Sequence, residues 1–169
     1  MRYFPLQMKG AVKRSVVTIV LALCLLAAVA VAGNRPPVKP TARDKCPVCG
    51  MFVAKYPGFT AQVVYKDGTY AVFDGAKDLF KYLQNLRKYA SGRQEAQFDG
   101  IHVTDYYSQK PVEATAARYV IGSDMLGPVG KEVIAFGKES DAVEFKKDHR
   151  GKNILRFREV TPVVIASLE

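Results

Sequence analysis

The fold is decided by one stretch of the chain, residues 59–90, which reads FTAQVVYKDGTYAVFDGAKDLFKYLQNLRKYA. Its first seven residues are rich in β-branched and aromatic side chains, which predicts a strand over residues 59–65. Asp67-Gly68 is a typical hairpin turn, so residues 69–73 are expected to form the return strand. Apolar residues then recur at helical spacing over residues 76–90, which predicts an amphipathic helix of about four turns.

Signals on both sides of this helix complete a first structural unit. Asp74 stands at the position expected for the helix N-cap, and Ser91-Gly92 is a typical helix end. After a loop, residues 101–107 have the composition of a third strand. The first half of the chain is therefore predicted to run strand, strand, helix, strand.

The second half of the chain repeats this order. In chain order, we expect a strand over residues 117–121, a glycine- and proline-containing loop over residues 124–130 and a strand over residues 132–136. A short helix capped by Ser140 and ending near Gly151 follows, and then a strand over residues 153–160. Each unit is too small to bury a core alone, so the two are expected to pack together. The predicted fold class is α+β, with two repeated ββαβ units over residues 44–112 and 113–169.

The N-terminal segment has the pattern of an export signal. Residues 1–14 are basic and contain no acid, and residues 15–32 carry no charge. Residues 1–32 are therefore expected to form either a cleaved signal peptide, ending at Ala30-Val31-Ala32, or a membrane anchor helix. Because Lys13-Arg14 would stay in the cytoplasm, both readings place the rest of the chain in the periplasm or on the extracytoplasmic face of the inner membrane.

Two further features lie within this segment and directly after it. Cys24 lies inside the apolar block, and it is interpreted as a small apolar residue or as a lipidation site, which the large Leu23 before it disfavours. Residues 33–43 contain three prolines and cannot form a helix or an inner strand, so they are predicted to be a linker.

The charge pattern limits the classes of partner. The formal net charge is +9, and it falls to +5 once the basic N-terminal segment is set aside. The remaining charges of both signs are interspersed, with no basic stripe of the kind that binds nucleic acid. We therefore expect no nucleic-acid partner, and membrane association only through the N-terminal segment or weak attraction to anionic headgroups.

The chemistry of the chain is concentrated in Asp44-Lys-Cys46-Pro-Val-Cys49-Gly-Met51. Two cysteines spaced C-x-x-C can bind one ion through both sulfurs. Thiolates are soft ligands that suit Cu(I) or zinc, and a thioether such as that of Met51 adds preference for Cu(I). Gly50 allows the backbone to reverse, with its amides pointing at the sulfurs. The segment therefore predicts a Cu(I) site formed by Cys46, Cys49 and Met51.

Three alternatives remain open for the cysteine pair. A structural zinc site needs four ligands, but no second C-x-x-C is present, and His102 and His149 lack paired spacing, so zinc is the less favoured ion. The pair could instead form a disulfide, since export leads to an oxidising compartment. A thioredoxin-like redox pair would open a helix after a strand, whereas this pair precedes the first predicted strand.

Several segments resemble the NosL family over about residues 44–160: the Cys46–Met51 motif, Tyr119-Val-Ile-Gly122-Ser123, Gly127-Pro-Val-Gly130 and Ala135-Phe136. The resemblance implies an exported, non-enzymatic Cu(I)-binding accessory protein for nitrous oxide reductase. Such a protein would deliver copper to a maturation protein or to the reductase. The resemblance also implies two ββαβ units that are similar to part of the organomercurial lyase fold.

The sequence departs from the family pattern at three positions. Typical members carry His and Met in the strand where this chain has Thr104 and Tyr106, and Met where it has Val129. Met125, in the loop beside Val129, is a candidate substitute ligand. The alternative function is a thiol-disulfide or organomercurial-cleaving enzyme, for which Asp74, just after the second predicted strand, is the candidate carboxylate proton donor, although a role as helix N-cap explains this residue fully.

Overall fold

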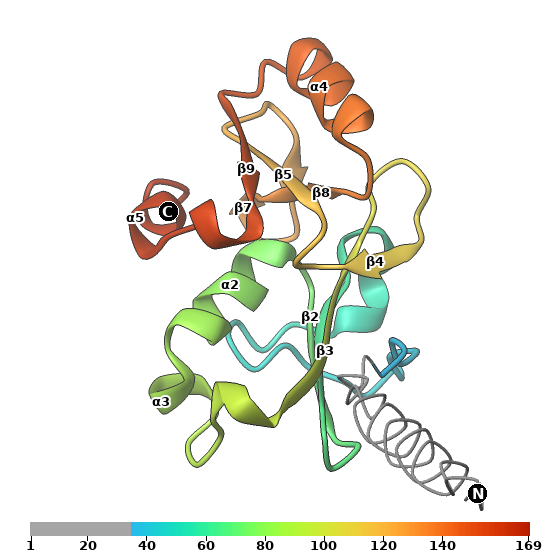
Figure 1. The fold of residues 1–169 in the computed structure, drawn as a ribbon, viewed down its shortest axis with the longest axis vertical. Coiled ribbons are helices and arrows are strands. Elements are labelled where there is room, and N and C mark those ends of the chain that lie inside the picture. The colour runs from blue at the N-terminus through green and yellow to red at the C-terminus, as the bar shows by residue number, and fades with distance from the viewer. Residues whose placement is uncertain (1–34) are drawn as a thin grey trace, which may run out of the picture. The chain divides into compact units, whose positions relative to one another are not determined.

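The structure is a computed structural model that describes residues 35–169 (Figure 1). The predicted signal or anchor helix and Cys24 lie outside the described residues. Among residues 35–169, no helix combines the length and apolar character needed to cross a bilayer.

The N-terminal repeat has the predicted order of elements: β1 (Ala61–Tyr65), β2 (Tyr70–Phe73), α2 (Ala76–Gln84) and β3 (Phe98–Thr104). Its sheet has the order β2-β1-β3-β4, and all of its pairs are antiparallel. The edge strand β4 (Pro111–Glu113) crosses the predicted boundary between the repeats. Short 3-10 turns over Val53–Lys55 and Pro57–Phe59 precede β1, and another over Glu95–Gln97 precedes β3.

The predicted single helix over residues 76–90 is wrong in one respect, because it is broken into α2 and α3 (Leu86–Tyr89). Asn85 separates them with φ −145° and ψ 61°, and its side chain accepts a hydrogen bond from the Lys88 amide at 3.2 Å. Asparagine competes for backbone hydrogen bonds in this way and therefore favours helix ends over helix interiors. The apolar spacing was continuous across this break, so periodicity alone did not reveal it.

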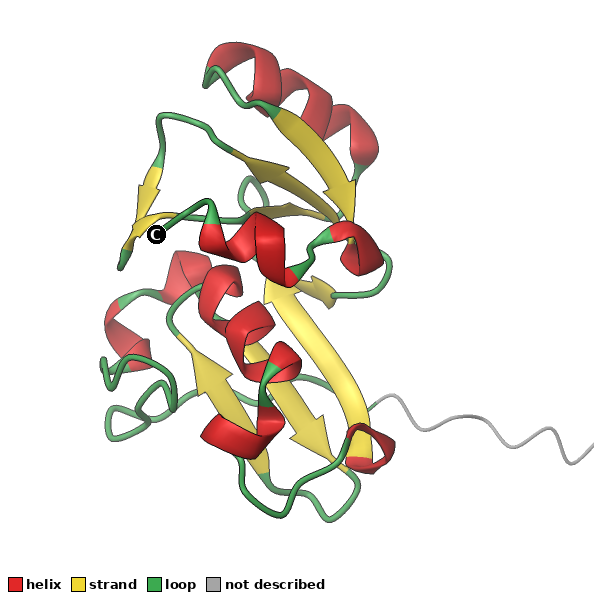
Figure 2. Ribbon diagram, turned by 90° about the vertical axis from the view of Figure 1, so that its left-hand side faces the viewer, coloured by secondary structure: helices red, strands yellow, loops and turns green. Residues whose placement is uncertain are grey.

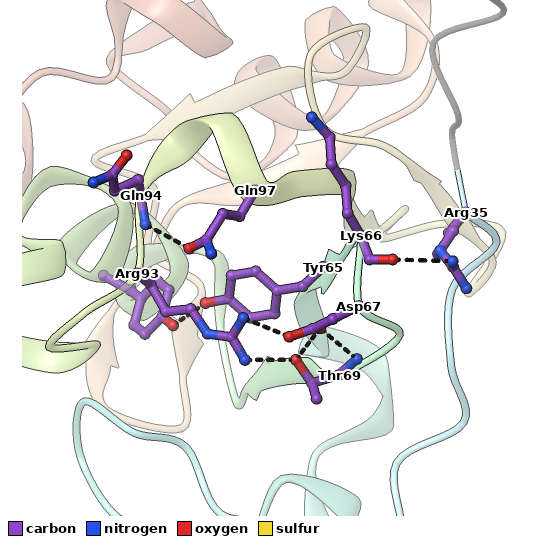
Figure 3. Close-up of polar contacts among 9 residues, drawn as sticks. Arg35, Tyr65, Lys66, Asp67, Thr69, Arg93, Gln94 and Gln97 are labelled. Atoms are coloured by element: carbon purple, nitrogen blue, oxygen red, sulfur yellow. Dashed lines mark hydrogen bonds and ion pairs between the residues drawn. The ribbon is translucent and has the colours of Figure 1, made fainter.

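The β1–β2 hairpin turns at Asp67-Gly68 as predicted and is tied to the loop after α3 (Figure 3). Asp67 accepts hydrogen bonds from the Thr69 amide at 2.9 Å and from the Arg93 guanidinium at 2.7 Å. The same guanidinium lies over the Tyr65 ring, 4.2 Å from its centroid. These contacts hold the turn of the β1–β2 hairpin against the loop that follows α3.

The C-terminal repeat has the same topology. It contains β5 (Arg118–Ile121), β8 (Ile134–Phe136), α4 (Glu139–Asp148) and β9 (Asn153–Arg156), with sheet order β8-β5-β9. This order matches β2-β1-β3 of the first repeat, so the predicted duplication is confirmed. The loop before β8 adds a small hairpin formed by β6 (Leu126–Gly127) and β7 (Gly130–Lys131).

Two details of the second repeat differ from the prediction. Lys138 is the N-cap of α4, so Ser140 lies within the first turn rather than at the cap. The last strand ends at Arg156 and gives way to a 3-10 turn over Phe157–Glu159. A further helix that was not predicted, α5 (Pro162–Ala166), follows it, capped by Thr161.

The two repeats share one main core. Alternate residues of a strand face opposite sides of its sheet, and β5 uses both sides: Tyr119 and Ile121 join the main core, whereas Val120 packs beneath α4. Tyr119 meets Phe80 of α2 edge-on, with ring centroids 5.1 Å apart. The second sheet therefore lies between α4 and the first repeat (Figures 1 and 2), and the predicted packing of the repeats is confirmed.

The described part of the predicted linker lies against the first sheet. The Val38 amide donates to Gln62 Oε1 at 2.8 Å, and the Val38 carbonyl accepts from Gln62 Nε2 at 3.2 Å. Arg35 pairs with Asp99 at 2.6 Å, and its carbonyl oxygen lies 2.8 Å from His102 Nε2. Residues 35–43 are thus held at the domain surface rather than spanning open solvent.

Candidate metal centre

The cysteine motif folds into a tight knuckle. The Cys46 amide donates to the Met51 carbonyl, and the Gly50 amide donates to the Cys46 carbonyl, both at 2.9 Å. Gly50 has φ +80°, a left-handed conformation that glycine adopts without steric cost. The amides of Val48 and Cys49 point at the Cys46 sulfur, and the Met51 amide points at the Cys49 sulfur. This geometry confirms the expected reversal at Gly50.

The knuckle places both sulfurs against two carboxylates of the first repeat. Cys46 Sγ lies 3.2 Å from Asp78 Oδ2, and Cys49 Sγ lies 3.2 Å from Asp74 Oδ1. One donor atom from each of the four residues can be chosen so that all four lie within 4.8 Å of one another. Asp74 follows β2, and Asp78 lies in the first turn of α2. Their contacts with the sulfurs show that both carboxylates face the knuckle.

Three of the four side chains are buried. Cys46, Asp74 and Asp78 are 1%, 0% and 2% exposed, whereas Cys49 is exposed to solvent. Among the described residues, Asp74 Oδ2 and Asp78 Oδ1 have no hydrogen-bond partner, although Lys81 Nζ lies 3.9 Å from Asp78 Oδ1. Buried polar atoms are rarely left unpaired, and this cluster of four side chains therefore has the donors and the free lone pairs that a cation needs.

The environment keeps both thiols protonated at neutral pH. Burial and, to a lesser extent, the neighbouring Asp78 and Asp74 carboxylates together raise the pKa of Cys49 to about 12. Burial raises the pKa of Cys46 still more strongly. Both cysteines are free thiols in the structure. A metal ion would have to displace their protons in order to bind, which links its affinity to pH.

Asp74 is not the helix cap that the sequence predicted. The N-cap of α2 is Gly75, and the Lys77 amide instead donates to Glu132 Oε1 of the second repeat at 2.7 Å. The predicted N-cap is one residue too early in the chain. The carboxylate that accepts a hydrogen bond from the first turn of the helix belongs to the second repeat, and no local sequence signal indicates it. Asp74 is consequently free to face Cys49.

The other predicted ligands occupy separate places. Met51 is half-buried at the end of the knuckle, and Met125 packs against the small core beneath α4. The assignments of Met51 and Met125 as ligands therefore stay predictions. His102 Nε2 lies 2.8 Å from the Arg35 carbonyl oxygen and His149 lies 3.1 Å from Asp124, so among the described residues neither histidine joins the two cysteines in the alternative Cys2His2 set.

The three positions that depart from the family pattern have other contacts. Thr104 donates to the Thr60 carbonyl at 2.7 Å, and Tyr106 packs edge-on against Phe145. The carbonyl of Val129, in the turn between β6 and β7, accepts a hydrogen bond from Lys77 Nζ at 2.7 Å. The β6–β7 turn therefore lies against the first turn of α2, the same turn that carries Asp78.

Sequence reasoning missed Asp78 as a site residue. A signal was present, since Asp74 and Asp78 are four residues apart at the start of a predicted helix, and such a pair lies on one helix face. Nothing in the sequence indicated that this face would meet the cysteine knuckle, which is 25 or more residues earlier in the chain.

Comparison with known proteins agrees with this architecture. The NosL family model matches residues 37–165. The copper-binding lipoprotein NosL of Stutzerimonas stutzeri is 30% identical over 127 residues, which are 72% of this chain and 64% of that protein. The chain thus spans just under two thirds of the length of this curated relative.

A solved structure has the same fold. The crystal structure of the copper chaperone NosL from Shewanella denitrificans superposes with a TM-score of 0.64 and 24% identity, over 76% of this chain and 97% of that one. The family match covers most of the described residues, including the knuckle and both repeats. The chain therefore belongs to the NosL family.

Proposed function

We propose that this chain is an exported accessory protein that binds Cu(I) as cargo through Cys46 and Cys49 and delivers it to a metalloenzyme maturation system. The observation that carries the proposal is the convergence of two free thiols in one knuckle, beside the Asp74 and Asp78 carboxylates. Thiolates are the protein ligands that Cu(I) prefers. The names of the two relatives, a copper-binding lipoprotein and a copper chaperone, support the same cargo.

The unequal exposure of the two thiols suits transfer. Cys46 is buried and would hold the ion on the protein side, whereas exposed Cys49 is accessible to a soft ligand of the recipient. The recipient is a copper-receiving maturation protein or the reductase itself. Met51, directly after the Gly50 turn, is the proposed thioether ligand, and Met125 is a second candidate.

The proposed location is the periplasm or the extracytoplasmic face of the inner membrane. The basic, then uncharged, segment over residues 1–32 supports export. The Stutzerimonas relative is named a lipoprotein, which supports attachment to a membrane.

An enzymatic role for the cysteine pair is not favoured. The contact between Cys49 and Asp74 does bring a thiol and a carboxylate together. However, reactive catalytic thiols have a lowered pKa, and burial raises the pKa of both thiols here. The proposal is therefore binding and transfer, without turnover.

Copper retention by cysteine variants tests this proposal. The reduced full-length chain is loaded with Cu(I), passed through a desalting column and analysed for bound metal. The C46S/C49S variant is expected to lose the copper. The C24S variant removes the third cysteine of the chain, outside the knuckle, and is expected to retain one equivalent. Equal retention by C46S/C49S and the wild type would refute the proposal.

A further inference from the structure

We propose that Lys45, Phe52 and Lys55 form a docking surface for an acidic protein that takes the copper from Cys49. The inference rests on the proposed Cu(I) function and adds the chemistry of the recipient. Lys45 directly precedes the cysteine knuckle, and Phe52 and Lys55 follow it. A recipient whose soft ligand reaches Cys49 therefore meets these three side chains.

The docking surface lies at the base of the knuckle. Lys45 and Phe52 pair as an isolated antiparallel bridge, so the loop between them carries both sulfurs. Three residues of chain span at most about 11 Å, and the backbone of Phe52 therefore lies within that distance of exposed Cys49. Lys55 follows at the end of the 3-10 turn over Val53–Lys55. The surface is thus directly beside the thiol that a partner can reach.

Phe52 holds two ammonium groups over a ring that is open to solvent. The residue is 39% exposed, although phenylalanine is usually buried. Lys45 Nζ lies 4.8 Å from the ring centroid, and Lys55 Nζ lies 5.7 Å from it. Both distances are within the range of cation–π attraction. Two positive charges are therefore fixed around one exposed aromatic side chain, a residue type that is enriched at protein interfaces.

The positive charge of this surface is not neutralised by ion pairs. In residues 35–169 neither Lys45 nor Lys55 forms one, and residues 1–34 contain no acid. The adjacent acid, Asp44, accepts a hydrogen bond from the Thr41 amide at 2.6 Å and lies 3.3 Å from the Tyr70 hydroxyl. An acidic protein surface is therefore the electrostatic complement. The segment over residues 35–58 contains five bases and one acid: Arg35, Lys39, Arg43, Lys45, Lys55 and Asp44.

Copper transfer favours a protein over an anionic lipid as the occupant. The recipient must supply a soft donor that binds Cu(I) while the bonds to Cys46 and Cys49 break. Copper stays Cu(I) throughout, and the released thiolates take up protons from the solvent. A phospholipid headgroup offers hard phosphate oxygens and no such donor. Because complementary charges chiefly speed the encounter of two partners, the surface should act on the rate of transfer more than on Cu(I) affinity.

The test measures how fast Cu(I) leaves the protein for two chelators that differ in charge. Bathocuproine disulfonate is anionic, whereas neocuproine has the same phenanthroline donors and is uncharged. The reduced full-length chain is loaded with Cu(I) as wild type, K45Q/K55Q and K45E/K55E. The K146E/K147E variant changes the charge equally on α4, on the far side of the second sheet, and serves as the matched control. Rates are measured at about 10 mM and about 500 mM ionic strength, where charges are weakly and strongly screened.

The quantity compared is the rate constant for the anionic chelator divided by that for the uncharged one. At low ionic strength this ratio should fall about 3-fold in K45Q/K55Q and on the order of 10-fold in K45E/K55E. The ratios should converge at high ionic strength, and the control should match the wild type. Equal ratios for wild type and K45E/K55E at low ionic strength would overturn the inference. An equal fall in the control would overturn it too, because overall charge would then explain the effect.

Two further readouts distinguish this inference from the proposed function and from lipid binding. Failure of the wild type to take up Cu(I) would overturn the proposed function and this inference with it. Equal ratios in copper-loaded proteins would overturn the docking surface alone. Binding to phosphatidylglycerol vesicles is compared with binding to phosphatidylcholine vesicles. If K45E/K55E loses a preference for the anionic vesicles while the chelator ratio stays unchanged, the surface binds lipid and the inference is wrong.

Discussion

Glu132 Oε1 accepts hydrogen bonds from the backbone amide of Lys77, at 2.7 Å, and from that of Val133, at 2.9 Å. Glu132 belongs to the second repeat and Lys77 to the first turn of α2, so one repeat supplies the helix cap of the other. The fit is close, because a Cβ on Gly75 would clash with the Glu132 carboxylate. This cap explains why Asp74 can face the cysteine knuckle.

Removal of this cap should destabilise the protein. In E132A the two buried amides lose their acceptor, and the free energy of unfolding should fall by about 2–4 kcal/mol. E132Q keeps a carbonyl oxygen in the same place and should lose much less. Urea unfolding at pH 8 in the presence of a chelator measures both. An E132A variant as stable as E132Q would contradict the capping role.

Glu132 should also make stability depend on pH. Burial raises its pKa from the usual 4.5 to about 7 in the folded protein. Between about pH 4.5 and 7 the folded state therefore keeps a proton that the unfolded chain has lost, and stability falls as the pH rises through this window. Relative to E132Q, the wild type should lose on the order of 3 kcal/mol between pH 5 and pH 8. Parallel pH profiles of the two proteins, from urea unfolding, would contradict this assignment.

The knuckle should depend on the conformation of Gly50. Gly50 and Gly92 have φ +80° and +88°, and a Cβ at either position would meet no atom within 4 Å. G50A and G92A should therefore lose a similar free energy of unfolding, about 1–2 kcal/mol, from backbone strain alone. Only G50A distorts the loop that carries the sulfurs, so only G50A should weaken Cu(I) binding. Equal Cu(I) affinity for the two variants would show that the knuckle geometry is not required.

The two thiols should react slowly and unequally with alkylating agents. Because burial raises the pKa of both, little thiolate is present at pH 7, and alkylation should be much slower than that of free glutathione. Exposed Cys49 should be modified before buried Cys46. Mass spectrometry of a time course of iodoacetamide treatment gives both rates. Rapid alkylation of Cys46 at pH 7 would instead support a redox or catalytic role.

The duplicated fold could be predicted from local signals. The strands and the Asp67-Gly68 turn were evident from composition and turn chemistry, and the same order of elements recurred in the second half. The break at Asn85 was missed because the apolar spacing continues across it. Helix α5 was missed although Thr161-Pro162 is a typical helix start, with a capping residue followed by proline at the first helical position.

The candidate site could be predicted only in part. The sulfurs of Cys46 and Cys49 are close in sequence, so their convergence was evident from spacing. The pairing with Asp74 and Asp78 depends on how the knuckle packs against the start of α2, which is a tertiary contact without a local signal. The prediction that Asp74 caps the helix was wrong for the same reason. The carboxylate that accepts from the Lys77 amide is that of Glu132, which lies 55 residues later in the chain.

The most direct test of the account is a Cu(I) titration of the reduced full-length chain against a competing chelator, with the C46S/C49S variant in parallel. We predict that the wild type binds one equivalent of Cu(I) tightly and that the double serine variant does not compete with the chelator. Failure of the wild type to bind, with its thiols shown to be reduced, would contradict the account. Tight binding by the double serine variant would contradict it as well.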